Sequence, residues 1–230
     1  MKKTYAVSDL HGYFNLYEQI KNFIQPEDKV IFLGDATDRG PQSLKLAKAI
    51  YADPQFTYLK GNHEDMLVKT ALDFYNGDDW YYESNLRHLL ENGGDTTWDS
   101  LLMEEDLGRD FIYKLKNLKT EVVYYNAEGK EIHLCHAGFT PGRRRDLLWD
   151  RKHLTDILDY IDDNYIIVHG HTPVAYQRNC DYWNEAAIDL SPEFYANGHK
   201  INIDMGTYGT KACCLLDLDT FEYHIFTVKD

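Results

Sequence analysis

The chain has 230 residues, of which 43% are hydrophobic, so it can bury a sizeable core and does not resemble a disordered protein. Its 24 basic and 38 acidic residues give a formal net charge of −14, which argues against nucleic acid and anionic membranes as partners. No apolar run approaches the ~18 residues of a membrane span and no signal-peptide core is visible, so we expect a cytoplasmic protein.

The first half of the chain alternates between apolar strand patterns and helical spacing. Strands are expected at 4–7, 29–33 and 56–59, and helices at 14–24, 42–51 and 66–75. This alternation is typical of βαβ units with a largely parallel sheet. Residues 76–119 are rich in Tyr, Trp, Leu and acids, and they predict a helical insertion that covers one edge of the core.

The second half turns to strands, expected at 121–125, 130–135, 165–169, 200–204, 212–217 and 222–228, with the first and last pairs forming hairpins. No linker or repeat interrupts the sequence. We therefore expect one α/β domain over residues 1–230, with two packed sheets flanked by helices. The four cysteines lack disulfide or metal spacing and are expected to be reduced thiols in the core: Cys135, Cys180, Cys213 and Cys214.

Five polar clusters each follow a predicted strand, and this order is the most informative feature of the chain. They are Asp9-Leu10-His11-Gly12, Gly34-Asp35-Ala36-Thr37-Asp38-Arg39-Gly40, Gly61-Asn62-His63-Glu64, His136-Ala137-Gly138 and His169-Gly170-His171-Thr172. Ligands of open α/β sheets bind at the carboxyl ends of the strands. Together the clusters predict a site there.

Asp9 and His11 are separated by one residue, so their side chains project to the same side and suit one metal ion. Asp35 ends a central strand, and its two oxygens can bridge two cations ~3.5–4 Å apart. Arg39 offers a planar fork for a phosphoryl group, and Asp38 can orient a neighbouring imidazole.

Asn62 and His63 are adjacent and project differently, so we expect an oxygen ligand and a proton donor respectively. Glu64 fits two roles, a group that supports the metal ligands or an acid at a helix N-terminus, and we favour the latter. His136 ends a strand with an exposed imidazole. Of His169 and His171, either fits a ligand by its position alone.

An Asp/His/Asn set without thiolates suits hard to borderline divalent ions, first Mn²⁺, with Fe, Zn, Co and Ni as alternatives. Two such ions activate water and neutralise a transferring phosphoryl group. The residues alone therefore predict metal-assisted hydrolysis of a phosphoester.

With these motifs, the chain resembles the calcineurin-like metallophosphoesterase superfamily, and within it the short bacterial and phage branch of the phosphoprotein phosphatases. The similarity covers roughly residues 4–209. It implies a four-layer α/β/β/α sandwich of two mixed sheets flanked by helices. It also implies one of two substrates, a phosphorylated protein or a symmetrical dinucleoside tetraphosphate.

Carried over to this chain, the resemblance implies that Asp9 and His11 bind one metal and that Asp35 bridges both. The second metal is expected at Asn62, His136 and His171, which leaves His169 without a ligand role. His63 becomes the general acid, supported by Asp38. Arg39 and Arg151 become phosphate clamps, and a metal-bound hydroxide is the expected nucleophile.

Three positions depart from the family pattern: Ala36-Thr37 replaces a bulkier pair, Ala137 replaces a glycine, and Pro173 stands where the wider superfamily has a second histidine. None removes an expected ligand, although Pro173 implies that the first metal has fewer protein ligands and more water.

We expect a Ser/Thr protein phosphatase, with phosphotyrosine as an additional substrate type. A dinucleoside polyphosphate hydrolase is the alternative, and a non-catalytic scaffold is the third. The sequence leaves open the oligomeric state, the substrate and the role of Arg143–Arg145.

Overall fold

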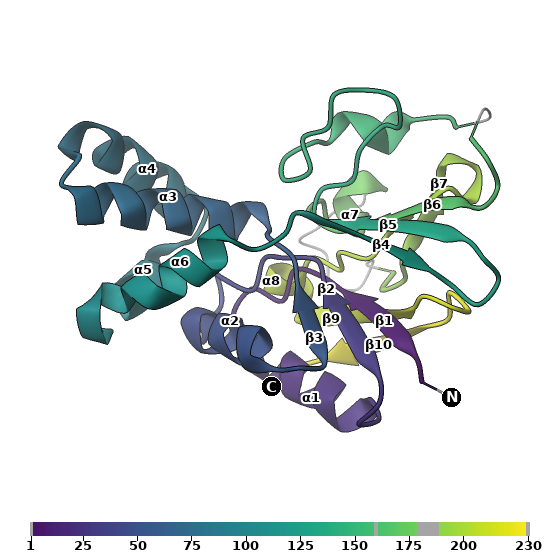
Figure 1. The fold of residues 1–230 in the computed structure, drawn as a ribbon, viewed down its shortest axis with the longest axis horizontal. Coiled ribbons are helices and arrows are strands. Elements are labelled where there is room, and N and C mark those ends of the chain that lie inside the picture. Colours follow the sequence, from purple (N-terminus) through teal and green to yellow (C-terminus); the bar gives the residue numbers. More distant parts are fainter. Residues whose placement is uncertain (1, 159–160, 179–188, 229–230) are drawn as a thin grey trace.

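The computed structural model describes residues 2–158, 161–178 and 189–228. A first sheet has the strand order β10-β9-β1-β2-β3, and a second sheet has the order β4-β5-β6-β8-β7. Both sheets are mixed (Figure 1): in the first, the parallel strands β1, β2 and β3 are joined on one side by the antiparallel strands β9 and β10, and in the second, the parallel strands β5, β6 and β8 have an antiparallel strand on either side. The expected α/β fold of two mixed sheets flanked by helices is confirmed.

The elements of the first half are β1 (Thr4–Val7), α1 (Phe14–Phe23), β2 (Lys29–Phe32), α2 (Ser43–Ala52), β3 (Phe56–Tyr58) and α3 (Asn62–Asn76). The strand positions were predicted to within one residue. The third helix, in contrast, begins four residues earlier than expected, so Asn62 and His63 lie in its first turn rather than in a loop.

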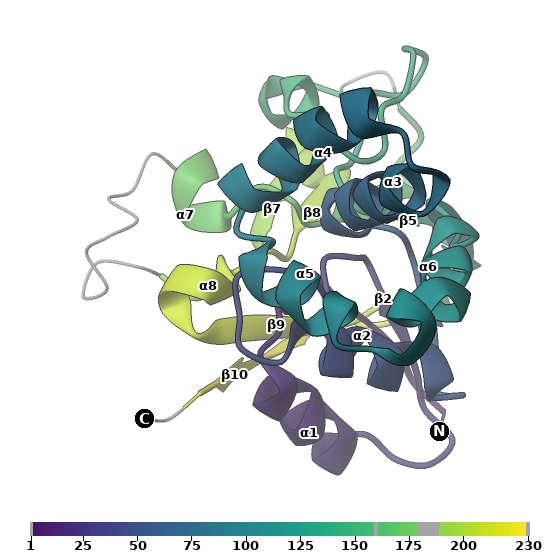
Figure 2. The ribbon, with the colours of Figure 1, turned by 90° about the vertical axis from the view of Figure 1, so that its left-hand side faces the viewer.

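The insertion contains α4 (Asp79–Glu91), α5 (Asp95–Leu102), η1 (Glu105–Gly108) and α6 (Arg109–Lys116). With α3, these helices extend from one side of the sheets, and Figure 2 shows them in front of the sheets. Their buried residues, among them Leu89, Trp98 and Ile112, belong to the same hydrophobic cluster as α1 and α2. The insertion therefore extends the main core instead of only covering its edge.

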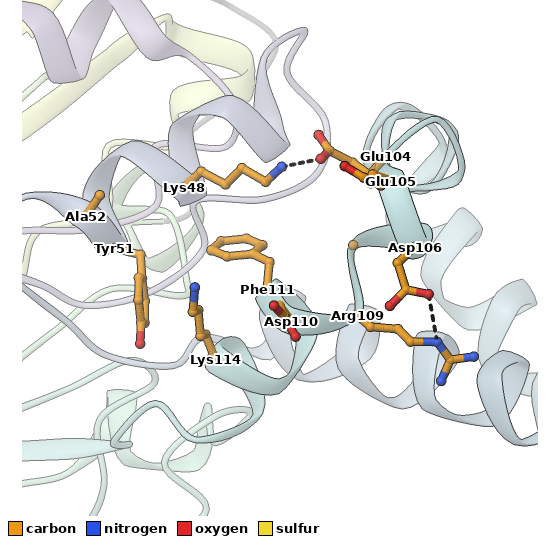
Figure 3. Close-up of a pocket in the computed structure, with 11 residues that line it drawn as sticks. Lys48, Tyr51, Ala52, Glu104, Glu105, Asp106, Arg109, Asp110, Phe111 and Lys114 are labelled. Atoms are coloured by element: carbon orange, nitrogen blue, oxygen red, sulfur yellow. Dashed lines mark ion pairs between the residues drawn. The ribbon is translucent and has the colours of Figure 1, made fainter.

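A crevice of about 450 Å³ lies between α2 and the segment of η1 and α6, and Figure 3 shows the residues that line it. Lys48 forms an ion pair with Glu104 at 2.6 Å, and the ring of Tyr51 lies edge-on to that of Phe111, with centroids 6.0 Å apart. No motif residue lines this crevice. It is a seam where the insertion packs on the core.

The elements of the second half are β4 (Glu121–Tyr125), β5 (Glu131–Cys135), η2 (Lys152–Thr155), β6 (Tyr165–His169), α7 (Val174–Gln177), β7 (Glu193–Tyr195), η4 (Ala196–Gly198), β8 (Lys200–Asn202), α8 (Thr207–Thr210), β9 (Ala212–Asp217) and β10 (Tyr223–Thr227). Both predicted hairpins, β4–β5 and β9–β10, are antiparallel pairs. The edge strand β7 and the short helices were not predicted.

Alternate residues of the central strands face two different cores. In β1, Tyr5 and Val7 join the cluster under the helices, whereas Ala6 joins the cluster between the two sheets. The period of two in a strand buried on both faces explains why β1 is apolar throughout. Cys135, Cys213 and Cys214 are buried free thiols, as expected, and Cys180 lies outside the described residues.

None of the helices in the described part of the chain has the length and apolar character that a membrane crossing demands.

Candidate metal centre and phosphate pocket

The predicted clusters meet where the parallel strands of both sheets end. Asp9 follows β1, Asp35 follows β2, His136 follows β5, His171 follows β6, and Asn62 begins the helix after β3. All of these side chains are buried, with at most 7% of each residue exposed. Each sheet therefore contributes residues to one polar cluster inside the molecule.

Six motif residues have a left-handed backbone, with φ between 41° and 70°: Asp9, His11, Asp35, Asp38, Arg39 and His171. For residues other than glycine, such a conformation costs about 1–3 kcal/mol each and persists only where the surroundings enforce it. The enforcement is visible in the loops after β1 and β2, where the amide of His11 donates to the carbonyl of Asp35 at 2.9 Å. Concentrated strain of this kind is typical of functional sites.

Asp35 lies at the centre of the cluster. Its Oδ2 is 3.4 Å from Nε2 of His136 and 3.8 Å from Nε2 of both His11 and His63. Two groups of candidate ligand atoms lie within 4.8 Å of one another, and they share this carboxylate: His11, Asp35 and His63 form one, and Asp9, Asp35 and His136 form the other. The geometry thus gives Asp35 access to two cation positions.

A second convergence point is the amide of Asn62. Nε2 of His136 and Nδ1 of His171 lie 2.7 and 2.9 Å from Oδ1 of Asn62. Nε2 of His171 is buried and has no hydrogen-bond partner among the described residues. The sequence predicted these three side chains as one group, and the structure brings them together.

Backbone carbonyls fix the orientation of two of the imidazoles. Nδ1 of His11 donates to the carbonyl of Thr37, and Nδ1 of His136 donates to that of Leu33, each at 2.9 Å. Both rings therefore direct Nε2 toward Asp35, the arrangement by which proteins orient histidines for metal binding.

The charges of the cluster are strongly coupled. Burial disfavours the charged form of Asp35, but the cations around it, His136 foremost, outweigh burial and hold its pKa well below the ordinary value. For His136, burial opposes protonation, but Asp35 raises its pKa to about 9. Burial lowers the pKa of His11 well below its ordinary value, and nearby Arg39 adds to this effect.

These residues fit divalent metal ions. The donors are carboxylate and amide oxygens and imidazole nitrogens, which suit hard to borderline ions. A guanidinium already lies on the free imidazole nitrogens, because Arg39 donates to Nε2 of His11 at 2.9 Å and contacts Nε2 of His63 at 3.0 Å. The cluster thus presents lone pairs and carboxylates to a positive charge.

His63 and Asp38 form the pair that the sequence suggested. Nδ1 of His63 donates to Oδ2 of Asp38 at 2.7 Å, and both residues are buried. The bond leaves Nε2 of His63 facing Arg39 and Asp35. The amide of His63, in the first turn of α3, also donates to Oδ1 of Asp35 at 3.0 Å, where a helix N-terminus favours an anion.

The insertion holds the segment of Asp38 and Arg39 in place. The amide of Arg39 donates to the carbonyl of Gly93 at 2.7 Å, and the amide of Asp38 donates to the hydroxyl of Thr97 at 2.9 Å. Gly93 has φ +86°, and a Cβ added there would lie 2.9 Å from Cγ of Arg39. A glycine is needed at this turn for both reasons.

Arg39 and Arg151 line one pocket of about 550 Å³, which we call the phosphate pocket. Its other lining residues are His171, Thr172, Pro173, Tyr176 and Tyr208. Nε of Arg151 donates to the hydroxyl of Thr172 at 3.2 Å. Two guanidinium groups beside the carboxylate and imidazole cluster form an anion site that can bind a phosphoryl group. The aromatic residues of the insertion, among them Trp80 and Tyr82, do not line this pocket, and Trp98 is packed against Phe74 and Tyr82.

Glu64 has a larger role than the helix-terminal acid that we expected. Its buried carboxylate accepts hydrogen bonds from six groups at 2.8–3.2 Å: the amides of Asp35, Ala36, Thr37 and Gly61 and the hydroxyls of Thr37 and Tyr58. One side chain therefore ties the Asp35 loop to the start of α3.

Sequence reasoning missed two further features. Asp204 is buried near Asp9, and burial raises its pKa well above the ordinary value; its place just beyond β8 was a usable signal. The ring of His169 does not join the metal cluster but contacts the hydroxyl of Tyr195 at 2.6 Å, and that hydroxyl lies 3.0 Å from Nδ1 of His153.

Comparisons with known proteins agree with this geometry. A family model described as calcineurin-like phosphoesterase matches residues 2–203. The chain is 28% identical over 183 residues to serine/threonine-protein phosphatase 2 of Escherichia coli (strain K12), covering 73% of this chain and 78% of that protein. It is 25% identical over 197 residues to a symmetrical bis(5'-nucleosyl)-tetraphosphatase of Legionella pneumophila (strain Philadelphia 1), covering 81% of this chain but only 61% of that protein.

Two solved structures share the fold at 14% identity. A proposed diadenosine tetraphosphatase has a TM-score of 0.62 and covers 98% of this chain and 93% of its own. A protein serine/threonine phosphatase from Saccharomyces cerevisiae with similarity to human phosphatase PP5 has a TM-score of 0.59 and covers 100% and 81%.

Proposed function

Since the chain belongs to the calcineurin-like phosphoesterase family and is therefore a phosphoester hydrolase, we propose that it removes phosphate from serine and threonine side chains of proteins. One observation carries the proposal. Two groups of side chains that could hold a metal ion share the buried Asp35 and adjoin a pocket with two arginines. This is the equipment that hydrolysis of a phosphate monoester requires.

In this proposal, Asp9, His11 and Asp35 hold one divalent ion, and Asp35, Asn62, His136 and His171 hold the other. Mn²⁺ is the proposed ion. Two such ions activate water for attack on phosphorus and neutralise charge on the phosphoryl group. The chain's own contribution would be to fix these donors at the ends of strands, and Glu64 accepts a hydrogen bond from the backbone amide of Asp35.

Arg39 and Arg151 bind the non-bridging phosphoryl oxygens and so position the phosphorus atom. His63 donates the proton that the leaving oxygen needs. Nδ1 donates to Asp38, which keeps the ring oriented, so the transferred proton comes from Nε2 and the acid form of His63 is the imidazolium, with both ring nitrogens protonated. Arg39 contacts Nε2 of His63 in the structure and also lines the pocket in which we place the phosphoryl group.

The likeness to the E. coli phosphatase supports a protein substrate, because it has the higher identity and covers more of the relative's length. The likeness to tetraphosphatases supports the alternative of a dinucleoside polyphosphate substrate. The motif residues serve both, since either reaction cleaves a P–O bond beside the same metal and arginine groups.

The proposal is tested by offering a phosphothreonine peptide and diadenosine tetraphosphate to the Mn²⁺-loaded protein in one buffer, with a chelator control. Peptide dephosphorylation as the faster reaction supports the proposal. Rapid formation of ADP with slow peptide turnover assigns the chain to the alternative. No reaction with either, or with an aryl phosphate, indicates a non-catalytic scaffold.

The His63→Asn variant tests the mechanism. Loss of a general acid lowers turnover by about 10²–10⁴-fold, while the metal content stays unchanged. The Asp38→Asn variant is expected to lower turnover in the same direction with the same metal content. If His63→Asn also loses metal, His63 is a ligand, and its assignment as the acid is wrong.

A further inference from the structure

A second cavity, of about 1010 Å³, adjoins the phosphate pocket and shares Arg151 with it. We call it the basic groove. It is lined by the continuous loop 143–152 together with Thr120 and Thr140. Five of its charged residues are basic and two are acidic, on a chain whose net charge is −14. The groove is therefore a local reversal of the protein's overall charge.

The loop that carries the arginines is anchored to the fold. The amide of Ala137 donates to the carbonyl of Leu147 at 2.8 Å, and the hydroxyl of Thr140 donates to Asp156 at 2.7 Å. Arg145 donates to Glu121 at 2.7 Å, and its guanidinium lies 4.9 Å from the ring centroid of Phe139. Arg145 thus supports the loop.

Arg143 and Arg144 are not used in this way. Both are exposed, and among the described residues neither guanidinium has an ion pair or a hydrogen bond. Within the described part of the chain, neither of these two charges is neutralised by an ion pair. A groove with unpaired guanidinium groups attracts anions and orients those that reach it.

The groove is continuous with the proposed site of chemistry. Its Trp149 contacts the ring of His171, with centroids 5.9 Å apart, and the ring of His88 in α4 at 5.6 Å. Arg151, at the inner end of the loop, also lines the phosphate pocket. A ligand that fills both cavities must therefore place a phosphoryl group at Arg151 and a second part of itself in the groove.

We propose that the basic groove binds acidic side chains that flank the phosphorylated residue of a protein substrate. This inference rests on the proposed function and names the class of protein that it acts on. Arg143 and Arg144 would pair with Asp or Glu carboxylates while Arg151 binds the phosphate.

The lining favours an acidic peptide over a polyphosphate. The apolar residues Leu147, Leu148 and Trp149 separate Arg143–Arg145 from Arg151 along the loop, and all of them line the groove. In a polyphosphate, each phosphate follows directly on the last, so cations are needed without a break. A peptide instead places uncharged and apolar groups between its phosphate and a more distant carboxylate.

The test uses fluorescently labelled phosphothreonine peptides of one length, with glutamates on either side of the phosphothreonine or with glutamines in their place. Binding is followed by fluorescence anisotropy and hydrolysis by phosphate release. The R143A/R144A double variant is compared with K2A/K29A. This control removes the same charge near the amino ends of β1 and β2, whereas the site lies at their carboxyl ends. Circular dichroism and thermal unfolding verify that both variants fold.

We expect the wild-type protein to prefer glutamate peptides by about 3- to 10-fold at low salt, the range for two exposed ion pairs. R143A/R144A loses this preference, whereas K2A/K29A retains it. Added salt weakens it in the wild-type protein.

The inference is overturned if the wild-type protein binds glutamate and glutamine peptides equally. It is also overturned if R143A/R144A and K2A/K29A lose the preference for glutamate peptides to the same extent. It is also overturned if R143A/R144A weakens binding of tripolyphosphate or diadenosine tetraphosphate but leaves acidic peptides unaffected. If no peptide is hydrolysed, yet acidic peptides bind in a manner that depends on Arg143 and Arg144, the proposed function fails and the groove's assignment stands.

Discussion

Replacing Glu64 by glutamine tests whether one buried carboxylate holds the metal-binding loop together. Oε1 of Glu64 accepts from the amides of Ala36 and Thr37 and from the hydroxyls of Thr37 and Tyr58, and Oε2 accepts from the amides of Asp35 and Gly61. Glutamine has one acceptor oxygen and one donating NH₂ group. Even in its better orientation, the NH₂ group faces the two amides that Oε2 now binds.

The expected loss in stability follows from this count. Two hydrogen bonds to a charged group contribute about 1.5–3 kcal/mol each, so their loss costs about 3–6 kcal/mol. A smaller effect acts in the opposite direction. Burying the charged carboxylate is unfavourable, as the raised pKa of Glu64 reflects, and the neutral glutamine avoids this cost. We therefore expect the free energy of unfolding to fall by about 2–4 kcal/mol.

Urea unfolding with a chelator present measures this change without a contribution from bound metal, and a Mn²⁺ titration measures metal affinity. The Glu18→Gln variant, at an exposed position of α1, is the control, since it removes the same charge where no such bonds exist. We expect weaker metal binding in Glu64→Gln only. If it unfolds within about 1 kcal/mol of the wild-type protein and binds metal normally, Glu64 is not the anchor that we describe.

Two further predictions concern the surroundings of the site. Gly93→Ala is expected to raise KM more than it lowers kcat, because its Cβ would lie 2.9 Å from Cγ of Arg39 and displace that side chain. The control is Gly77→Ala, which has the same backbone strain of about 1–2 kcal/mol at positive φ but whose Cβ would meet no neighbouring atom within 4 Å. Equal kinetics in the two variants would contradict the reasoning. Burial lowers the pKa of His153 to about 4, whereas a histidine of an unfolded chain has a pKa of ~6.5. Between these two values the unfolded state binds one more proton than the folded state. The free energy of unfolding therefore falls as the pH drops from 6.5 toward 4. Urea unfolding across this range should show a smaller decrease for His153→Gln, by up to about 3 kcal/mol, and parallel curves for the two proteins would contradict the assignment.

The parts of the site that follow strand ends could be predicted from the sequence. Asp9, Asp35 and His136 each follow a short apolar run, and the carboxyl ends of parallel strands meet at one edge. The start of α3 could not be placed in the same way. Asn62 and His63 are poor helix formers, and this first turn is stabilised by Glu64, which closes back on the amide of Gly61.

Contacts between distant segments escaped the sequence for a different reason. The bonds of Arg39 to Gly93 and of Asp38 to Thr97 join residues more than 50 positions apart, and no local pattern marks them. The edge strand β7 has only three residues, Glu193–Tyr195, too few for a period of two to stand out. The insertion was predicted as helical, but its hold on the arginine that faces the metal cluster became visible only in the structure.

The left-handed backbone of the motif residues has a consequence for how this protein responds to substitution. At Asp38 and Arg39, with φ of 70° and 68°, glycine would relieve backbone strain, since it adopts positive φ without a steric cost. The same exchange would remove the partner of His63 or the guanidinium of the phosphate pocket. The strained backbone and the proposed chemistry are therefore bound to the same positions, so variants that relieve the strain there also lose the side chains of the site.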